Sequence, residues 1–456
     1  MEEMKRREVE AFEKYGETFQ LKGLAKYIVA TMDPKVCEKI LGNSTSYLEK
    51  ATHYSILRAV AGNGLICSPV NKWRGQRKII QPAFTAMNMF KGFVDIFDKK
   101  SQIFVGLMKD RCDGQLIDIN HSIERLAGDI LMETSMGLQS NDQVTHNSAY
   151  IQANNTLTRL CVKRISSYWK RFDILFSTFA VREKRLHDEN MAIARDFAMQ
   201  VIENRRKFLL QQNTANNSDS VDQEDGGKAK AMCFVDTLLQ SAIDGEPLSN
   251  EDILDQMHTL MIGGQDTTAF TISIALFLLS RHKHVQDQVY GEIKDVFGGE
   301  KNSPITYEQL LELKYMELVL KETLRLYPAV TIIGRNIDRD LKLDDGRIIP
   351  AGVDVRLYLG MMMRNPKYFT NPDAFCPERF ASTNFNHFTY APFSAGKRDC
   401  IGKKFAMFSM KTVLARVLQQ YELVEMGEDP IIQNGLVSRS VNGFQMAFKL
   451  RDDVQC

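Results

Sequence analysis

Cysteine, tryptophan and long apolar runs are all scarce in this sequence. Its 456 residues include only 8 cysteines and 2 tryptophans. No two cysteines are separated by just two residues, which speaks against a zinc-knuckle site. The cysteines are also sparse and follow no secretory signal, so we expect reduced thiols that face a cytosol-like compartment.

The sequence also lacks a run of about 20 apolar residues, the length needed to cross a bilayer. The first residues are charged through Lys14, with no apolar signal core. The longest apolar stretch, residues 269–279, is interrupted by Thr271 and Ser273. We therefore expect no membrane-spanning helix and no N-terminal anchor in the sequence as written. Net charge is +1, and no basic stripe with interleaved aromatic residues occurs, so we expect no nucleic-acid partner.

Local patterns predict a single helix-rich α+β domain over residues 1–456, mainly α with small sheets. Residues 211–230 lack the apolar side chains that offset ordering entropy, so we expect a disordered surface loop there. Ser249 and Asp252 resemble a capping box at the start of a long helix. Helical patterns cover residues 181–209, 250–280, 307–327 and 406–423. Strand patterns cover residues 21–32, 348–359 and 443–450.

One short stretch, Phe-Ser-Ala-Gly-Lys-Arg-Asp-Cys-Ile-Gly at residues 393–402, comes just before the predicted helix at residue 406. Gly396 and Gly402 would let the backbone turn tightly and approach a flat partner closely. Cys400 follows two basic residues and precedes a helix N-terminus, which favours its thiolate. A thiolate is a strong axial ligand for haem iron. The alternative is a buried structural cysteine in a turn, which is the common fate of a single cysteine.

The complete string resembles the haem-binding signature of the cytochrome P450 superfamily, Phe-x-x-Gly-x-Arg-x-Cys-x-Gly, with every fixed position matched. The resemblance implies a cytochrome P450 fold around a buried haem b. It implies Cys400 as the axial ligand of the iron and Phe393 packed near its sulfur. It also implies Arg398 at a haem propionate and Gly402 in the cofactor-binding loop.

A second match, Gly-Gly-Gln-Asp-Thr-Thr at residues 263–268, lies in the middle of the predicted helix at residues 250–280. Each glycine costs a helix about 1 kcal/mol relative to alanine, so a kinked core helix with a solvated acid is the alternative. The motif resembles the family's oxygen-activation helix. That resemblance implies that Gly263 and Gly264 leave room for dioxygen and substrate, and that Asp266 and Thr267 relay protons. Many similar sequences carry a glutamate at Gly263 that bonds to haem, so we expect non-covalent haem here.

A third match is Glu322-Thr-Leu-Arg325, a pair that on an exposed helix is worth only a few tenths of a kcal/mol. It resembles the Glu-x-x-Arg motif of the family, and Phe-Cys-Pro-Glu-Arg-Phe at residues 375–380 resembles the segment that supplies Arg379. The resemblance implies a buried ion network that fixes the loop around Cys400.

A fourth match, Trp73 and Arg77, lies four residues apart on one predicted helix face. An amphipathic surface helix is the alternative. The resemblance implies that both side chains contact the haem carboxylates, and that Arg335 does so as well.

The nearest resemblance within the superfamily is to the family-four clan, especially its insect members. It implies a monooxygenase that inserts one oxygen atom into an apolar substrate: a fatty acid, a terpenoid or hormone, or a xenobiotic. It implies electrons from an NADPH-dependent flavoprotein reductase, with cytochrome b5 as a further partner, on the cytosolic face of the endoplasmic reticulum. Peripheral membrane contact is expected, and residues 169–176 could lie at a membrane surface, line a substrate channel or pack in the core.

Three side chains after the Glu-x-x-Arg helix, Ala329, Val330 and Ile332, are predicted to line an apolar substrate pocket together with Gly263. Lys411 and other basic residues near the cysteine motif could form a positive face for an acidic redox partner. Two alternatives remain at this point: a haem-thiolate isomerase or dehydratase that uses no dioxygen, and a haem-binding carrier for apolar ligands. The Asp266-Thr267 pair argues against the first, because such an enzyme has less need of a proton relay.

Overall fold

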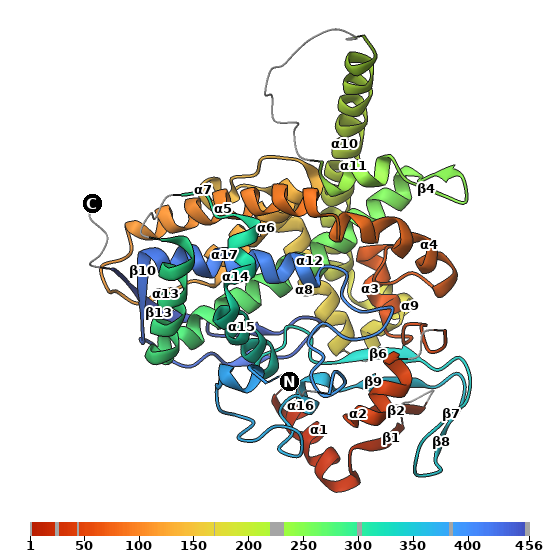
Figure 1. Cartoon of the computed structure of the whole chain (residues 1–456). Coiled ribbons are helices and arrows are strands. Elements are labelled where there is room, and N and C mark those ends of the chain that lie inside the picture. The colour runs from red at the N-terminus through yellow and green to blue at the C-terminus, as the bar shows by residue number, and fades with distance from the viewer. Residues whose placement is uncertain are drawn as a thin grey trace. The chain divides into compact units, whose positions relative to one another are not determined.

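The computed structural model describes residues 2–22, 27–42, 45–167, 169–218, 232–298, 303–382 and 386–451. Helices dominate and the sheets are small, which confirms the predicted fold class (Figure 1). The chain packs as two compact units. The first comprises Met1–Tyr54, Ser101–Glu124 and Asp266–Cys456, and the second comprises Ser55–Lys100 and Arg125–Gln265. The single domain remains a prediction.

A four-stranded sheet belongs to the first unit. Its strand order is β1-β2-β9-β6, with bounds Thr18–Lys22, Tyr27–Thr31, Asp354–Leu357 and Ile333–Asn336. Strands β1 and β2 pair antiparallel, whereas β2 and β9 run parallel with Val29 opposite Val355. Both valines are buried in one apolar cluster with Leu357, so burial fixes this register. The predicted strand at residues 21–32 is therefore two strands that pair with each other.

The remaining strands of the first unit are short. The prediction at residues 443–450 corresponds to β13, and the prediction at residues 348–359 contains both β8 and β9. β10, β13 and β3 form a three-stranded sheet, while β7–β8 and β11–β12 are two-stranded ribbons. Their bounds are Tyr421–Val424 (β10), Gln445–Leu450 (β13), Ile117–Asp118 (β3), Leu341–Lys342 (β7), Ile348–Ile349 (β8), Ile432–Gln433 (β11) and Arg439–Ser440 (β12).

Helix α17 (Lys403–Gln420) is the most completely buried helix of the first unit, because every residue from Phe408 to Gln419 is buried. It begins three residues before the prediction and ends at Gln420, where the chain continues as β10 and pairs with β13. The other helices of this unit are α1 (Glu2–Tyr15), α2 (Pro34–Cys37), η1 (Glu38–Gly42), α13 (Lys283–Phe297), α14 (Tyr307–Glu312), α15 (Lys314–Leu326), α16 (Leu359–Met362) and η4 (Pro377–Phe380).

The helix predicted at residues 307–327 is two helices, α14 and α15, which meet at Leu313. Leu313 has φ −71° and ψ 77°, outside the helical region. The carboxylate of Glu292 on α13 accepts hydrogen bonds from the backbone N–H groups of Tyr315 (2.6 Å) and Met316 (2.9 Å). A helix N-terminus leaves such donors without partners inside the helix. A distant carboxylate therefore stabilises a second helix start.

The second unit is built from helices and one two-stranded ribbon, β4–β5 (Ala242–Ile243 and Glu246–Pro247). Tyr150 of α8 stacks on Phe197 of α10, with ring centroids 4.5 Å apart. Helix α10 ends at Ser218, so the first eight residues of the predicted loop at 211–230 are helical. This is possible because each residue added to an existing helix gains a hydrogen bond without the cost of starting a new helix. Residues 219–230 lie outside the described residues. The helices are α3 (Tyr54–Ala61), α4 (Val70–Ile80), η2 (Gln81–Phe84), α7 (Asp142–Thr145), α8 (Ala149–Ser166), η3 (Trp169–Arg171), α9 (Asp173–Phe179), α10 (Val181–Ser218) and α11 (Phe234–Leu239).

Helices α5 (Met87–Lys109), α6 (Asn120–Met136) and α12 (Asn250–Arg281) each run from one unit into the other. One half of the predicted capping box of α12 is present, because Ser249 Oγ accepts from the backbone N–H of Asp252 at 3.1 Å; the hydroxyl also donates to the Asp252 carboxylate at 2.6 Å. By length and composition, α12 is the one described helix that could cross a membrane, but 78% of its apolar window is buried inside the protein.

Candidate functional site: the Cys400 loop and its supports

The loop at residues 393–402 holds Cys400 in a defined turn before α17. Its backbone N–H donates to the carbonyl oxygen of Phe393 at 2.9 Å. Gly396 has φ +74°, and a Cβ atom there would lie 1.8 Å from the carbonyl oxygen of Leu41. Only glycine fits at that position. Cys400 is exposed, whereas the other described cysteines are buried or half-buried, so its thiol is the accessible one among them.

Gly402 lies in a tight turn, as expected, because the backbone N–H of Lys403 donates to Cys400 O at 3.4 Å. Its φ is −84° and its ψ is 8°, a conformation open to any residue, and it caps the N-terminus of α17. A Cβ atom at this position would meet only the sulfur of Cys400, at 3.9 Å. The absence of a side chain therefore keeps the space beside this sulfur open.

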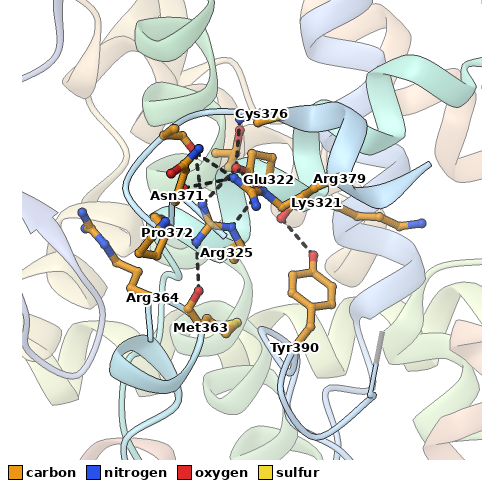
Figure 2. A network of polar contacts seen from close by, with 12 residues as sticks. Lys321, Glu322, Arg325, Met363, Arg364, Asn371, Pro372, Cys376, Arg379 and Tyr390 are labelled. Atoms are coloured by element: carbon orange, nitrogen blue, oxygen red, sulfur yellow. Dashed lines mark hydrogen bonds and ion pairs between the residues drawn. The ribbon is translucent and has the colours of Figure 1, made fainter. Parts of the chain in front are cut away.

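The structure brings Glu322, Arg325 and Arg379 together, as Figure 2 shows. Nε and Nη2 of Arg325 donate to the two carboxylate oxygens of Glu322 at 2.8 and 2.9 Å. Nε of Arg379 donates to Oε1 of Glu322 at 2.9 Å, and so does the backbone N–H of Cys376 at 3.0 Å. The side chains of Glu322 and Arg325 are 0% exposed, so this ion network is buried.

Both arginines of this network also bind backbone carbonyl groups of the segment at residues 363–374. Nη1 of Arg325 donates to Met363 O at 2.9 Å and to Pro372 O at 2.7 Å. Nη1 of Arg379 donates to Thr370 O at 2.9 Å. The guanidinium of Arg325 thus links α15 to this irregular segment, and that of Arg379 links η4 to it, because each donates to backbone carbonyl groups that lie outside the helices and sheets.

Tyr390 extends this network toward the cysteine loop, and the sequence did not single it out. Its hydroxyl donates to Lys321 O of α15 at 3.0 Å, next to Glu322 (Figure 2). Burial raises the pKa of Tyr390 well above its ordinary value, and the charge of Glu322 raises it further. The side chain therefore remains a neutral hydrogen-bond donor that ties residue 390 to α15.

Arg335 lies on β6 and is fully buried, yet no carboxylate pairs with it among the described residues. Its Nη1 donates only to the backbone carbonyl of Gly334, at 3.1 Å. Burial lowers the pKa of this guanidinium, although the group stays charged at any ordinary pH. A buried charge without an opposite charge is costly, so Arg335 is suited to receive an anion. Arg398 of the cysteine loop is also buried.

In the second unit, Trp73 and Arg77 lie four residues apart on α4, as predicted. Trp73 is buried and Arg77 is half-buried. Nε of Arg77 donates to Oε1 of Gln81 at 3.3 Å, within the same helix and the turn that follows.

Two adjacent glycines, Gly263 and Gly264, lie in the middle of α12. The helix is continuous from Asn250 to Arg281. In the second unit, a Cβ atom at Gly264 would lie 3.0 Å from two methyl groups of Leu131, and one at Gly263 would lie 3.3 Å from Ile66. Close packing against these two side chains is a physical reason for the pair of glycines that the sequence alone did not reveal.

Asp266 and Thr267 follow on the same helix, within the first unit. Asp266 forms an ion pair with Arg439 of β12, with Nη2 of the arginine 2.6 Å from Oδ2. The backbone carbonyl of Thr267 accepts a hydrogen bond from Thr271 Oγ1 at 2.8 Å. Sequence reasoning missed Arg439, because a two-residue strand carries no periodic pattern.

The predicted pocket residues after α15 have mixed surroundings. Ala329 is buried, and its carbonyl accepts from the backbone N–H of Ser438 at 2.8 Å. Val330 and Ile332 are half-buried, and each packs against a core cluster, Ile332 against Phe12 and Tyr358. Core packing therefore accounts for part of their apolar character, and their pocket role stays a prediction.

Comparison with known proteins identifies the family. The sequence model described as Cytochrome P450 matches residues 1–447. The chain belongs to the cytochrome P450 family. It is 39% identical to Cytochrome P450 4d2 of Drosophila melanogaster over 96% of this chain and 87% of that protein. It is 33% identical to Cytochrome P450 4c3 of the same organism over 93% of this chain and 80% of that protein. The haem domain of cytochrome P450DA shares the fold at 22% identity, with a TM-score of 0.81 over 97% of this chain and 92% of that chain.

Membership identifies the chain as a cytochrome P450 monooxygenase with a haem-thiolate cofactor. The residues of the first unit fit such a group. Cys400 offers an accessible sulfur ligand, and the buried Arg335 needs an anion of the kind that a haem propionate supplies. The described residues contain no group of His, Cys, Asp and Glu that could hold a separate metal ion.

A cytochrome P450 requires a redox partner, and one predicted element of its docking face is corrected. Lys411 of α17 is buried, not on the surface, because its ammonium donates to Leu310 O at 3.0 Å and to Glu317 at 3.2 Å. Burial lowers its pKa. Lys403, at the start of the same helix, is exposed.

Proposed function

We propose that this cytochrome P450 inserts one oxygen atom into an apolar organic substrate, a fatty acid, a terpenoid or hormone, or a xenobiotic. Electrons come from NADPH through a flavoprotein reductase, with cytochrome b5 as a further donor. The observation that carries the proposal is the accessible Cys400 thiol, held at the N-terminus of α17 in a loop that only glycine at position 396 permits. A thiolate in such a position is the ligand that favours O–O cleavage on haem iron.

Cys400 is the proposed axial ligand, and Phe393 and Gly402 shape the space beside its sulfur. Arg335 and Arg398 are proposed to bind the haem carboxylates in the first unit, and Trp73 and Arg77 are the proposed contacts from the second. The fully buried guanidinium of Arg335 supports this role, since a propionate would neutralise a charge that the described chain leaves unmatched. Gly263 has no side chain that could form an ester, so the haem b is non-covalent.

The ion network of Glu322, Arg325 and Arg379 is proposed to fix the segment that precedes the cysteine loop. Tyr390 supports this role, because it lies just before that loop and its hydroxyl donates to Lys321 O of the helix that carries Glu322 (Figure 2). A ligand loop that must hold a sulfur in one place benefits from such a rigid support.

Protons are proposed to reach the reaction site through Asp266 and Thr267, next to Gly264. Haem, when bound, supplies the oxygen activation, and the chain supplies binding, orientation and proton delivery. Asp266 accepts a proton from solvent at a carboxylate oxygen and passes it toward the Thr267 hydroxyl. Ala329, Val330, Ile332 and Gly263 are proposed to face the apolar substrate.

Membrane contact is proposed for the apolar surface between η3 and α10. Ile174, Phe179 and Val181 are 81%, 71% and 63% exposed, which is unusual for large apolar side chains that lie close in sequence. Phe176 of the same segment is buried, so one residue of α9 packs inward while its neighbours remain exposed. A peripheral contact on the cytosolic face of the endoplasmic reticulum would cover these side chains.

The decisive experiment is the reduced carbon-monoxide difference spectrum, with the absorption band that gives the family its name. We expect the wild-type chain to show the thiolate band and Cys400→Ser to lose it while keeping its fold by circular dichroism. Cys376→Ser is the matched control, because this half-buried cysteine contacts the ion network through its backbone N–H, which the substitution keeps. A normal band in Cys400→Ser would overturn the ligand assignment.

A further inference from the structure

The carboxylate of Asp266 is held by an arginine from a remote part of the chain. Nη2 of Arg439 lies 2.6 Å from Oδ2 of Asp266, although 173 residues separate the two. The side chain of Asp266 is 12% exposed and that of Arg439 is 34% exposed, so the arginine is the more exposed partner of this half-buried pair. A hydrogen bond between two charged groups at this distance is among the stronger side-chain contacts.

The backbone that carries Arg439 is itself firmly anchored. Strand β12 pairs with β11, with Arg439 opposite Gln433. The neighbouring residue Ser438 is buried; its N–H donates to Ala329 O at 2.8 Å and its hydroxyl donates to Pro328 O at 3.0 Å. Arg439 therefore reaches Asp266 from a fixed base beside a segment that we propose to line the substrate pocket.

We propose that Arg439 is a positioning residue for proton delivery, which holds the carboxylate of Asp266 in one orientation. In that orientation the carboxylate takes a proton from solvent. Protonation removes the ionic attraction to the guanidinium, so the carboxyl group can turn away and pass its proton toward Thr267. The carboxylate then returns to its ionised form, so one proton moves inward per cycle and nothing is oxidised in the relay. This inference rests on the proposed role of Asp266.

The test needs no known substrate, because the enzyme supplied with NADPH and a flavoprotein reductase reduces dioxygen by itself. Two electrons and two protons per dioxygen give hydrogen peroxide, whereas four electrons and four protons give two water molecules. The second route needs O–O cleavage and thus inward proton delivery. The measurement is the ratio of water to peroxide formed, obtained from NADPH, dioxygen and peroxide balances, together with the solvent isotope effect on NADPH oxidation in deuterium oxide.

We expect Asp266→Asn to lower the ratio of water to peroxide by about 10-fold, which is less than the roughly 100-fold or more that a positioned proton donor contributes, because water can supply part of the protons. Arg439→Gln should lower it by about 5-fold and change the isotope effect, and Arg439→Lys should restore most of the loss, since the cation is kept. Arg347→Gln, which removes an exposed arginine paired with Asp345, is the control and should behave as wild type. Each variant must first show the normal carbon-monoxide band and thermal unfolding.

The outcomes separate the inference from the function on which it rests. If Asp266→Asn lowers the ratio but Arg439→Gln leaves both measurements at wild-type values, the role of Arg439 is wrong. The same conclusion follows if Arg439→Lys loses as much as Arg439→Gln. If Asp266→Asn has no effect, or if the wild type forms peroxide alone, the relay under the proposed function is wrong.

Discussion

Replacing Glu322 with glutamine tests whether the buried ion network supports the haem site. The substitution keeps the size of the side chain but removes its charge and one acceptor oxygen. Four donors converge on the carboxylate, from Arg325 (two), Arg379 and the backbone N–H of Cys376. The glutamine amide would point N–H groups at one set of these donors. Two guanidinium groups would then share a buried site without a counter-charge.

Breaking a buried ion pair from one side costs about 3–5 kcal/mol, so we expect Glu322→Gln to lose that much. With the usual unfolding entropy per residue applied to 456 residues, this corresponds to a fall in Tm of about 3–5 °C. The assay combines thermal unfolding with the haem content after purification, and we expect both to fall. Glu312→Gln, an exposed residue of α14, is the matched control and should stay within about 0.5 kcal/mol. A Glu322→Gln protein with wild-type Tm and full haem content would refute this reasoning.

Two further predictions concern other parts of the chain. Burial raises the pKa of Glu8, which accepts from the Tyr358 hydroxyl at 3.1 Å, so its neutral form is favoured in the folded state. The resulting stabilisation of α1 is complete when pH is below the ordinary pKa of a glutamate, and it is lost as pH rises through the raised pKa of Glu8. Hydrogen exchange of the α1 amides should therefore become faster over this pH range. Glu8→Gln should remove this pH dependence. The double substitution Ile174→Glu and Phe179→Glu should lower the affinity for phosphatidylcholine vesicles, measured by co-sedimentation, by at least about 10-fold. Ile348→Glu, which changes an exposed residue of β8, is the control and should leave this affinity unchanged. Equal binding of all variants would exclude α9 from the membrane contact.

Helices with strong local signals could be predicted from the sequence, whereas breaks set by distant residues could not. The capping pair Ser249 and Asp252 lies within four residues, and the structure places α12 where this signal begins. The break at Leu313 has no such local cause, because the carboxylate that stabilises the second helix start comes from Glu292 on another helix. Apolar residues recur with helical spacing across residues 307–327, but this spacing carries no information about a hydrogen bond from another helix.

The environment of individual side chains was the second feature that could not be predicted from the sequence. Lys411 is basic and lies on a helix next to the cysteine motif, which suggested an exposed position. Helix α17 is buried from Phe408 to Gln419, so no face of this part is free for a lysine. The paired glycines of α12 show a second contact that the sequence could not reveal. In the second unit, the missing side chain of Gly264 admits the methyl groups of Leu131 at contact distance.

Two buried arginines of the first unit differ in a way that indicates different roles. The charge of Arg325 is matched within the chain, since both oxygens of Glu322 accept from its guanidinium. The charge of Arg335 meets only a backbone carbonyl among the described residues. A chain that leaves one buried cation unmatched loses stability unless an anion arrives from outside. Arg325 therefore belongs to the supporting scaffold, and Arg335 is the group from which we expect a contribution to haem affinity: Arg335 depends on the cofactor, whereas Arg325 does not.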